Sequence, residues 1–160
     1  MFEWLKPKTA GWKAPEARGP AVAIKVLSPA DTPIVGSARW VGDELRVESQ
    51  GPAIKSLFDV PLPQLEQCRV DYGFLIRTEA LQSAVYPLMW CRVPELGNFF
   101  SKGIERKVAG TQDWTHVEIS FYLEEGQVAD LVQLSLAFEG PGQVWLKEFT
   151  VSSTPTRSKQ

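Results

Sequence analysis

The chain has 160 residues, of which 44% are hydrophobic and 22% are charged, and 17 Lys and Arg against 19 Asp and Glu give a net charge of −2. This length fits one domain with short tails, and the balanced charge argues against a dedicated nucleic-acid-binding protein, which needs a basic surface for phosphates. One His and two Cys exclude a multi-histidine metal centre and leave a structural zinc site short of soft ligands, so we expect no metal and no other cofactor.

The two ends of the chain are predicted to be tails. Residues 1–20 mix Pro, Gly and charged residues, which predicts an irregular arm; its Trp4 and Trp12 either pack on the domain or anchor a partner or a membrane surface. Residues 153–160 are polar and interrupted by proline, which predicts a disordered tail and leaves 21–152 as the ordered domain. No apolar run is long enough for a signal peptide or a transmembrane segment. We therefore expect a cytoplasmic location, unless the chain is a trimmed fragment of an exported protein.

Between the tails, apolar and polar residues alternate with the period of β-strands. The even-numbered residues from Val70 to Ile76 are apolar or aromatic, as are the odd-numbered residues from Val117 to Leu123. Similar patterns give about eight strands: 21–27, 44–48, 53–60, 69–79, 84–93, 114–123, 131–138 and 143–151. Turn residues separate these segments, which predicts an all-β fold, an antiparallel two-sheet β-sandwich with one solvent-facing side per sheet.

The last third of the chain carries a recognisable arrangement of Gly, Trp and alternating residues. Residues 110–114 read GTQDW, a strand follows, and then come 134–140 (LSLAFEG) and 142–146 (GQVWL). This arrangement resembles the C-terminal half of galactose-binding-like β-sandwich domains, the jelly-roll fold of many carbohydrate-binding modules. The likeness covers roughly residues 22–151.

The resemblance implies a jelly-roll topology in which the rings of Trp114 and Trp145 fill the space between the sheets. It also implies a tight strand connection at Gly140 and Gly142. Lys147-Glu148 stands where such sequences commonly carry acidic residues, which argues against the structural calcium that some relatives bind. The fold hosts sugar binding, lipid-surface binding, protein docking and accessory domains of enzymes, so it does not decide the function.

Several residues expected on the outer sides of the strands suggest a ligand-binding face. They combine aromatic rings with planar charged groups: Arg77, Trp90, Arg92, His116, Glu118 and Tyr122. Such a mixture suits a sugar, because a ring stacks on its CH face while charged groups bond its hydroxyls. The alternative is a solvated face with cross-strand ion pairs. Jelly-roll strands alternate between sheets, so half of these residues could lie on the opposite surface.

The segment 95–103 (ELGNFFSKG) is a second candidate, predicted as a loop. Its Asn98, Phe99 and Phe100 could cover a ligand or contact a membrane or a protein. In the alternative interpretation, one Phe fills the end of the sandwich and the other is partly exposed.

We thus expect a non-catalytic module for a carbohydrate or similar polar ligand. The alternative is an intracellular protein-interaction or oligomerisation domain that uses the N-terminal arm and residues 95–103. His116 and Glu118 lie two apart on one strand, as an acid–base pair requires, but no nucleophile stands in a recognisable context. We therefore do not expect an enzyme, and we expect Cys68 and Cys91 to be two small buried thiols rather than a disulfide. The oligomeric state is not predicted.

Overall fold

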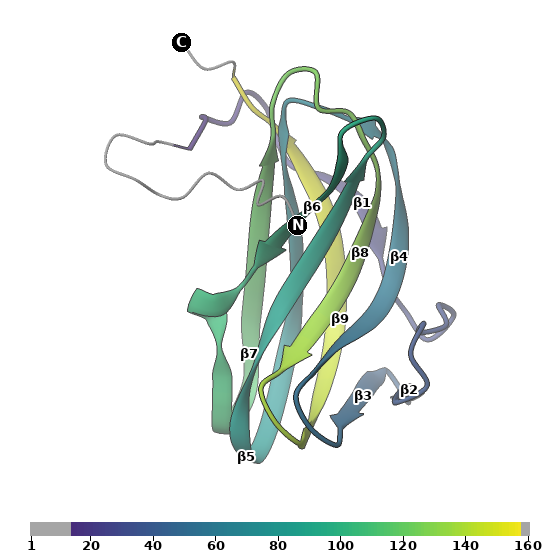
Figure 1. The fold of residues 1–160 in the computed structure, drawn as a ribbon, viewed down its shortest axis with the longest axis vertical. Coiled ribbons are helices and arrows are strands. Elements are labelled where there is room, and N and C mark those ends of the chain that lie inside the picture. The colour runs from purple at the N-terminus through teal and green to yellow at the C-terminus, as the bar shows by residue number, and fades with distance from the viewer. Residues whose placement is uncertain (1–13, 158–160) are drawn as a thin grey trace.

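Strands account for most of the structure, a computed structural model that describes residues 14–157 (Figure 1). The elements are β1 (Val22–Val26), β2 (Ala38–Val41), β3 (Glu44–Ser49), β4 (Ala53–Leu65), β5 (Cys68–Val93), β6 (Gly97–Lys102), a 3-10 turn η1 (Ile104–Arg106), β7 (Val108–Leu123), β8 (Ala129–Phe138) and β9 (Gly142–Pro155). Every pairing between them is antiparallel. The predicted all-β class is confirmed.

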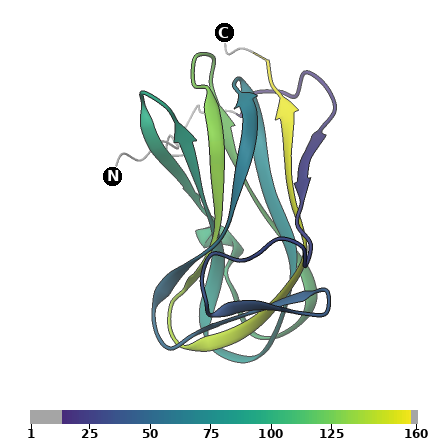
Figure 2. The same ribbon diagram turned by 90° about the vertical axis from the view of Figure 1, so that its right-hand side faces the viewer.

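The long strand β5 belongs to both layers of the sandwich. Its first half, residues 68–78, pairs with β9 on one side and with β7 on the other. Its second half, residues 85–92, pairs with β8 and β6 instead. One continuous sheet therefore curls into two layers. The first layer contains β1, β3, β9, β5 and β7, and the second contains β4, β8, β5 and β6. We call them the β7 layer and the β6 layer. Figure 2 shows the β2–β3 hairpin lying across the lower end of the strands.

A bend in β5 sets which side chains face outward in each layer. The register with the neighbouring strands shifts between Thr78, Leu81 and Val85, and Ala80 has a left-handed φ of 49°. Before the bend the even-numbered residues from Val70 to Thr78 are buried, and after it the odd-numbered residues from Val85 to Val93 are buried. This change of phase agrees with the alternation in the two predicted strands 69–79 and 84–93. In the structure these two segments form the single strand β5.

The core lies between the layers and is rich in aromatic rings. Tyr72 is fully buried, donates a hydrogen bond from its hydroxyl to the carbonyl of Ser135 at 3.3 Å, and packs 5.3 Å from the ring of Phe74. Phe149 links this pair to Phe58, with ring centres 5.8 Å from Phe74 and 5.5 Å from Phe58. Together with these rings, side chains of β3, β7 and β8 fill the interior, which leaves the outer sides of both layers for function.

The two ends of the described chain lie together. The N–H of Arg18 donates to the carbonyl of Pro155, and the N–H of Arg157 donates to that of Glu16. β9 continues to Pro155 and Thr156 is buried, beyond the residue 152 at which we expected the ordered domain to end. Trp4, Trp12 and most of the predicted arm lie outside the described residues.

Candidate functional site

The nine residues singled out in the sequence do not share one surface. Trp90 and Arg92 follow the bend of β5 and face outward from the β6 layer, where β6 also lies. Arg77 precedes the bend, and it faces outward from the β7 layer with three residues of β7: His116, Glu118 and Tyr122. Because the layers turn their outer sides in opposite directions, the set forms two separate surfaces.

A row of four outward side chains crosses the β6 layer. The register places Trp90 of β5 opposite Phe100 of β6 and Gln133 of β8, and Gln133 opposite Asp59 of β4. The rings of Trp90 and Phe100 lie 5.3 Å apart between centres and are both half-buried. We call the outer surface around Phe100, Trp90, Gln133 and Asp59 the Trp90 face.

Hydrogen bonds fix the polar end of the Trp90 face. The Gln133 amide nitrogen donates to Asp59 Oδ1 at 2.9 Å, and its oxygen accepts from Ser56 Oγ at 3.1 Å. The amide is thus held in one orientation beside the indole of Trp90. In the preceding row Leu88 and Ser135 are buried, whereas Lys102 of β6 is exposed. Lys102 thus borders the Trp90 face on the side of β6.

Arg92 stands in the next row and is held by an acid. Its Nε donates to Asp130 Oδ1 at 2.8 Å and its Nη2 to Oδ2 at 3.2 Å, a two-point contact between planar groups. This hydrogen bonding raises the pKa of Arg92 and lowers the pKa of Asp130. Both groups stay ionised at neutral pH and present a fixed array of donors and acceptors beside Trp90.

The segment predicted as a loop is mostly the strand β6. Asn98 is exposed and pairs with Arg92 across the strands, whereas Phe99 is buried in the core opposite Cys91. Phe100 points outward again because β-strand side chains alternate. Phe99 therefore lies in the interior and Phe100 on the Trp90 face. This agrees with the alternative interpretation, in which one Phe fills the sandwich and the other is partly exposed.

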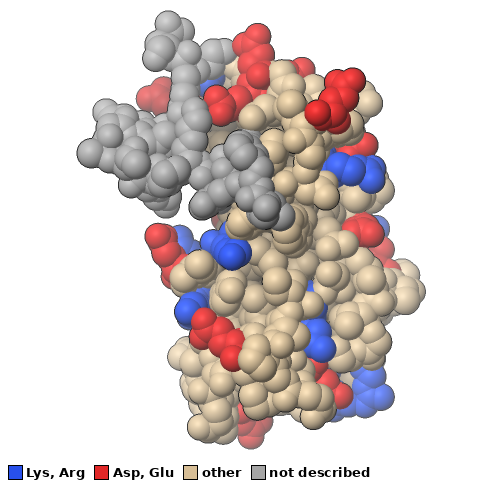
Figure 3. Space-filling model, viewed as in Figure 1, with Lys and Arg blue, Asp and Glu red and all other residues tan. Residues whose placement is uncertain are grey.

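Figure 3 shows the molecule from the side of β4, β5, β6 and β8. Lys, Arg, Asp and Glu are scattered mainly along its margins, and much of the centre is uncharged. The Trp90 face itself combines two aromatic rings and an amide with the charged groups of Asp59, Arg92 and Asp130, which are held by hydrogen bonds. Such a surface suits a ligand rich in hydroxyl groups.

The opposite surface, on the β7 layer, holds two further Trp residues. Trp114 and Trp145 do not fill the space between the sheets, as the resemblance implied, but lie half-buried on the outer side. The guanidinium carbon of Arg77 lies 4.2 Å from the ring centre of Trp145 and 5.6 Å from that of Trp114, and Lys147 Nζ lies 4.2 Å from Trp114. These cation–π contacts explain why large rings are stable on an outer surface.

His116 and Glu118 also lie on this surface, both exposed, and they flank one glycine of β5. A Cβ on Gly73 would lie 3.2 Å from His116 Nε2 and 3.4 Å from Glu118 Oε2. The missing side chain at position 73 thus leaves room for both groups over the strand.

Tyr122 belongs to a polar network at the far end of the β7 layer. Arg69 Nε donates to Asp71 Oδ1 at 2.9 Å, and Ser120 Oγ donates to the same oxygen. Burial opposes the charge of Arg69, but the carboxylate of Asp71 and the hydroxyl of Tyr122 outweigh it and raise the pKa of Arg69. Because Asp71 is buried within this network, its contacts are structural.

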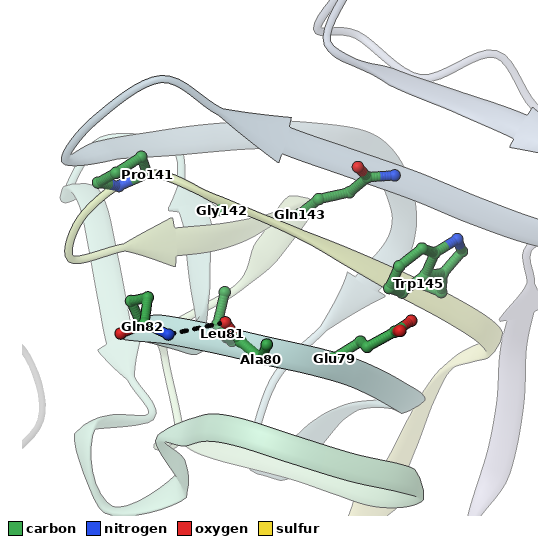
Figure 4. A pocket seen from close by; sticks show the side chains of 8 residues that line it. All are labelled: Glu79, Ala80, Leu81, Gln82, Pro141, Gly142, Gln143 and Trp145. Atoms are coloured by element: carbon green, nitrogen blue, oxygen red, sulfur yellow. Dashed lines mark hydrogen bonds between the residues drawn. The ribbon is translucent and has the colours of Figure 1, made fainter.

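A groove of about 440 Å³ opens where β5 bends away from β9 (Figure 4). Its lining comes from both strands and the turn before β9: Glu79, Ala80, Leu81, Gln82, Pro141, Gly142, Gln143 and Trp145. Figure 4 shows Trp145 and Glu79 at one end of the groove and Gln82 and Pro141 at the other.

The remaining candidates contribute no reactive chemistry. Cys68 and Cys91 are free and buried, which confirms the prediction of two buried thiols. Within residues 14–157 no three His, Cys, Asp or Glu side chains gather as a metal site would require. In the same part of the chain, no helix has the length and apolar character needed to cross a bilayer.

Three members of the Trp90 face were missed in the sequence: Gln133, Asp59 and Asp130. The available signal is alternation, because Asp59 lies between Phe58 and Val60 and Gln133 lies between Val132 and Leu134, all four of them apolar. Their meeting with Trp90 depends on the pairing of β4, β8 and β5, which a single sequence does not reveal.

Comparisons with known proteins agree with this architecture. The xylan-binding domain CBM22-1 of Xyn10C from Paenibacillus barcinonensis superposes with a TM-score of 0.52 at 14% identity, over 88% of this chain and 86% of that domain. The fold is that of the carbohydrate-binding β-sandwich modules.

A viral protein shares the same fold. A chain in the structure of infectious bursal disease virus, Gx strain, superposes with a TM-score of 0.57 at 9% identity, and the match covers 98% of this chain and 38% of the viral one. No protein-family model matches the sequence, and no curated protein matches it either. The likeness therefore shows the fold, and function has to be argued from the surface.

Proposed function

We propose that this chain is a non-catalytic carbohydrate-binding domain that holds its ligand on the Trp90 face. The observation that carries the proposal is the row of Phe100, Trp90, Gln133 and Asp59 across four strands. The xylan-binding domain with the same fold supports the choice of ligand class.

The chemistry of the row fits a neutral glycan. A pyranose ring has an apolar CH face that would lie on the indole of Trp90, which is half-buried beside Phe100. Its hydroxyl groups would meet the Gln133 amide, the Asp59 carboxylate and the Arg92–Asp130 pair, whose orientations are already fixed. Groups held before binding lose little entropy when the ligand arrives.

The Arg92–Asp130 ion pair beside Trp90 argues for binding rather than hydrolysis. Glycoside hydrolysis needs one carboxyl group that is protonated, to act as general acid. Asp130 has a lowered pKa because of its hydrogen bond from Arg92, so it holds no proton to donate at neutral pH. Asp59 accepts from the Gln133 amide, and His116 and Glu118 lie on the opposite layer.

Tryptophan fluorescence titration tests the proposal with oligosaccharides of xylan, glucan and mannan. We expect one of these neutral glycans to change the emission, and Trp90→Ala to weaken its binding by about tenfold or more, as expected for a central aromatic contact.

The matched control is Trp114→Ala, which removes a half-buried outer Trp from the other layer and should leave the affinity unchanged. Retained folding of both variants is checked by circular dichroism. Glycan binding that is the same in Trp90→Ala and in the unaltered chain would overturn the proposal.

The exposed Leu96 and Ile104, which flank β6, support the second candidate function, a protein-interaction or oligomerisation domain. In that case Leu96→Ser with Ile104→Ser would lower the mass measured by light scattering or abolish capture of a partner. A chain that is monomeric before and after the change, and that captures nothing, would count against this function.

A further inference from the structure

The groove between β5 and β9 arises from the bend of β5. Thr78 pairs with Val144 of β9, and Leu81 then pairs with Gly110 of β7 instead. The gap that opens is about 440 Å³ in volume, enough for one or two sugar rings. It lies on the side of the β7 layer, away from the Trp90 face.

The groove combines an aromatic ring, held by a cation–π contact, with polar side chains that solvent can reach; the Gln82 amide nitrogen donates to the carbonyl of Ala80 at 3.3 Å, and the Gln82 amide oxygen remains available as an acceptor (Figure 4). Arg77 stacks on Trp145 at 4.2 Å from its ring centre, which fixes the indole at the end of the groove. Glu79 and Gln82 are exposed and Gln143 is half-buried. Within residues 14–157, no cationic side chain comes within ion-pair distance of Glu79.

The floor of the groove is tightly packed, so its shape is set by the fold. Leu81 is buried, and a Cβ on Gly142 would lie only 2.4 Å from Leu81 Cδ1. The left-handed Ala80 is held by a hydrogen bond from its N–H to Thr111 Oγ1 at 2.9 Å. A side chain at position 142 would therefore have to displace Leu81.

We infer that this groove is a second saccharide-binding site, with Trp145 as the stacking platform and Glu79, Gln82 and Gln143 as partners for hydroxyl groups. The inference rests on the proposed function for its ligand class. Charged groups of both signs surround the groove: Glu79 lines it and Glu48 pairs with Gln143, whereas Arg46 and Arg77 pair with Trp145 on its two sides. Because the two carboxylates balance the two guanidinium groups, the groove has no net positive charge to select a uronate or a sulfated sugar, and we assign it a neutral sugar.

Two sites on opposite faces make the domain bivalent. A long glycan or two neighbouring chains of a polysaccharide would then be held with greater avidity than either site gives alone. The two sites are separable by mutation, because they share no residue.

The test is a titration of the full chain with neutral oligosaccharides, followed by backbone amide NMR shifts. We expect two groups of shifted amides, one around Trp90 and Gln133 and one around residues 79–82 and 142–145. Trp145→Ala should weaken binding at the second group by tenfold or more and leave the first unchanged, and Trp90→Ala should do the reverse.

The controls separate this site from the Trp90 face and from loss of folding. Trp114→Ala removes the other indole near Arg77 without touching the groove and should preserve both groups of shifts. The double variant Glu79→Ala, Gln82→Ala changes two exposed residues, so it tests the groove even if Trp145→Ala does not fold.

Each outcome decides one of the two proposals. Shifts confined to the Trp90 face would overturn the second site and leave the proposed function standing. Shifts confined to the groove would support the second site and overturn the assignment of the Trp90 face. Tighter binding of a uronate oligosaccharide than of its neutral counterpart, or no shift with any glycan, would overturn the inference.

Discussion

Asp71 shows how a single buried carboxylate can hold an outer surface together. It accepts hydrogen bonds from Arg69 and Ser120, and Arg69 also reaches Thr154 of β9 at 3.4 Å. Asp71 and Arg69 together thereby join three strands of the β7 layer. Removal of the carboxylate would take the acceptor away from two half-buried donors, Arg69 and Ser120.

We predict that Asp71→Ala lowers the free energy of unfolding by about 1.5–3 kcal/mol, the usual contribution of hydrogen bonds to a charged group. Urea denaturation followed by tryptophan fluorescence measures the change. The control is Glu139→Ala, which breaks the half-exposed ion pair with Lys107 and should change stability little. Equal effects of the two substitutions would contradict the structural role of Asp71.

The two buried thiols predict how stability depends on pH. Burial, with a smaller effect of the Asp71 charge, raises the pKa of Cys68 to about 11, and burial raises the pKa of Cys91 further. Thiols in the unfolded chain ionise at about 8.5. The unfolded state therefore releases these protons first, and stability should fall as pH rises above about 8.5.

Urea denaturation at pH 7, 8.5 and 10 tests this dependence. The double variant Cys68→Ala, Cys91→Ala should lose less stability between pH 8.5 and 10 than the unaltered chain. An equal loss in both proteins would show that the thiols are not responsible.

At the scale of elements, β6 and the turn after it are positioned by close packing at Gly103. A Cβ at this position would lie 2.7 Å from both Ile119 Cγ2 and Pro87 Cγ. The N–H of Gly103 donates to the carbonyl of Pro87 at 2.8 Å, which ties the end of β6 to β5. The Phe100 ring of the Trp90 face depends on this attachment.

Gly103→Ala should lower the free energy of unfolding by about 1–3 kcal/mol, because an added methyl group overpacks the contact. Gly51→Ala is the matched control, since no atom lies within 4 Å of the Cβ position there. Thermal denaturation of the two variants gives the comparison. A Gly103→Ala protein as stable as Gly51→Ala would show that β6 can shift at no cost.

At the scale of the whole molecule, the alternation of residues was the most informative sequence signal. It assigned the inner and outer sides of β5, β7 and β8, because a strand with one buried side must alternate. It did not reveal that β5 runs through both layers, because the alternation is interrupted at residues 80–83, and a turn between two separate strands would produce the same interruption. It also missed β6, whose short polar sequence with Gly97 and Asn98 is typical of a loop.

The proposed binding surface was predicted only in part, because the sequence does not show which strands pair with each other. Trp90, Arg92, Asn98 and Phe100 share one face because β5 and β6 are neighbours, whereas Tyr122 lies on the other layer. Such neighbours are set by contacts between distant segments, which one sequence does not encode in a readable pattern. The cation–π partners of Trp114 and Trp145 likewise come from other strands, Arg77 from β5 and, for Trp114, also Lys147 from β9.

The central claim is that a neutral glycan binds on the Trp90 face, and one measurement tests it most directly. It is the affinity of the best-binding neutral oligosaccharide for the unaltered chain, for Trp90→Ala and for Trp114→Ala, all confirmed to be folded. The account predicts binding that is weakened about tenfold or more by Trp90→Ala and unchanged by Trp114→Ala. Equal affinity in all three proteins, or no binding of any neutral glycan to the unaltered chain, would contradict it.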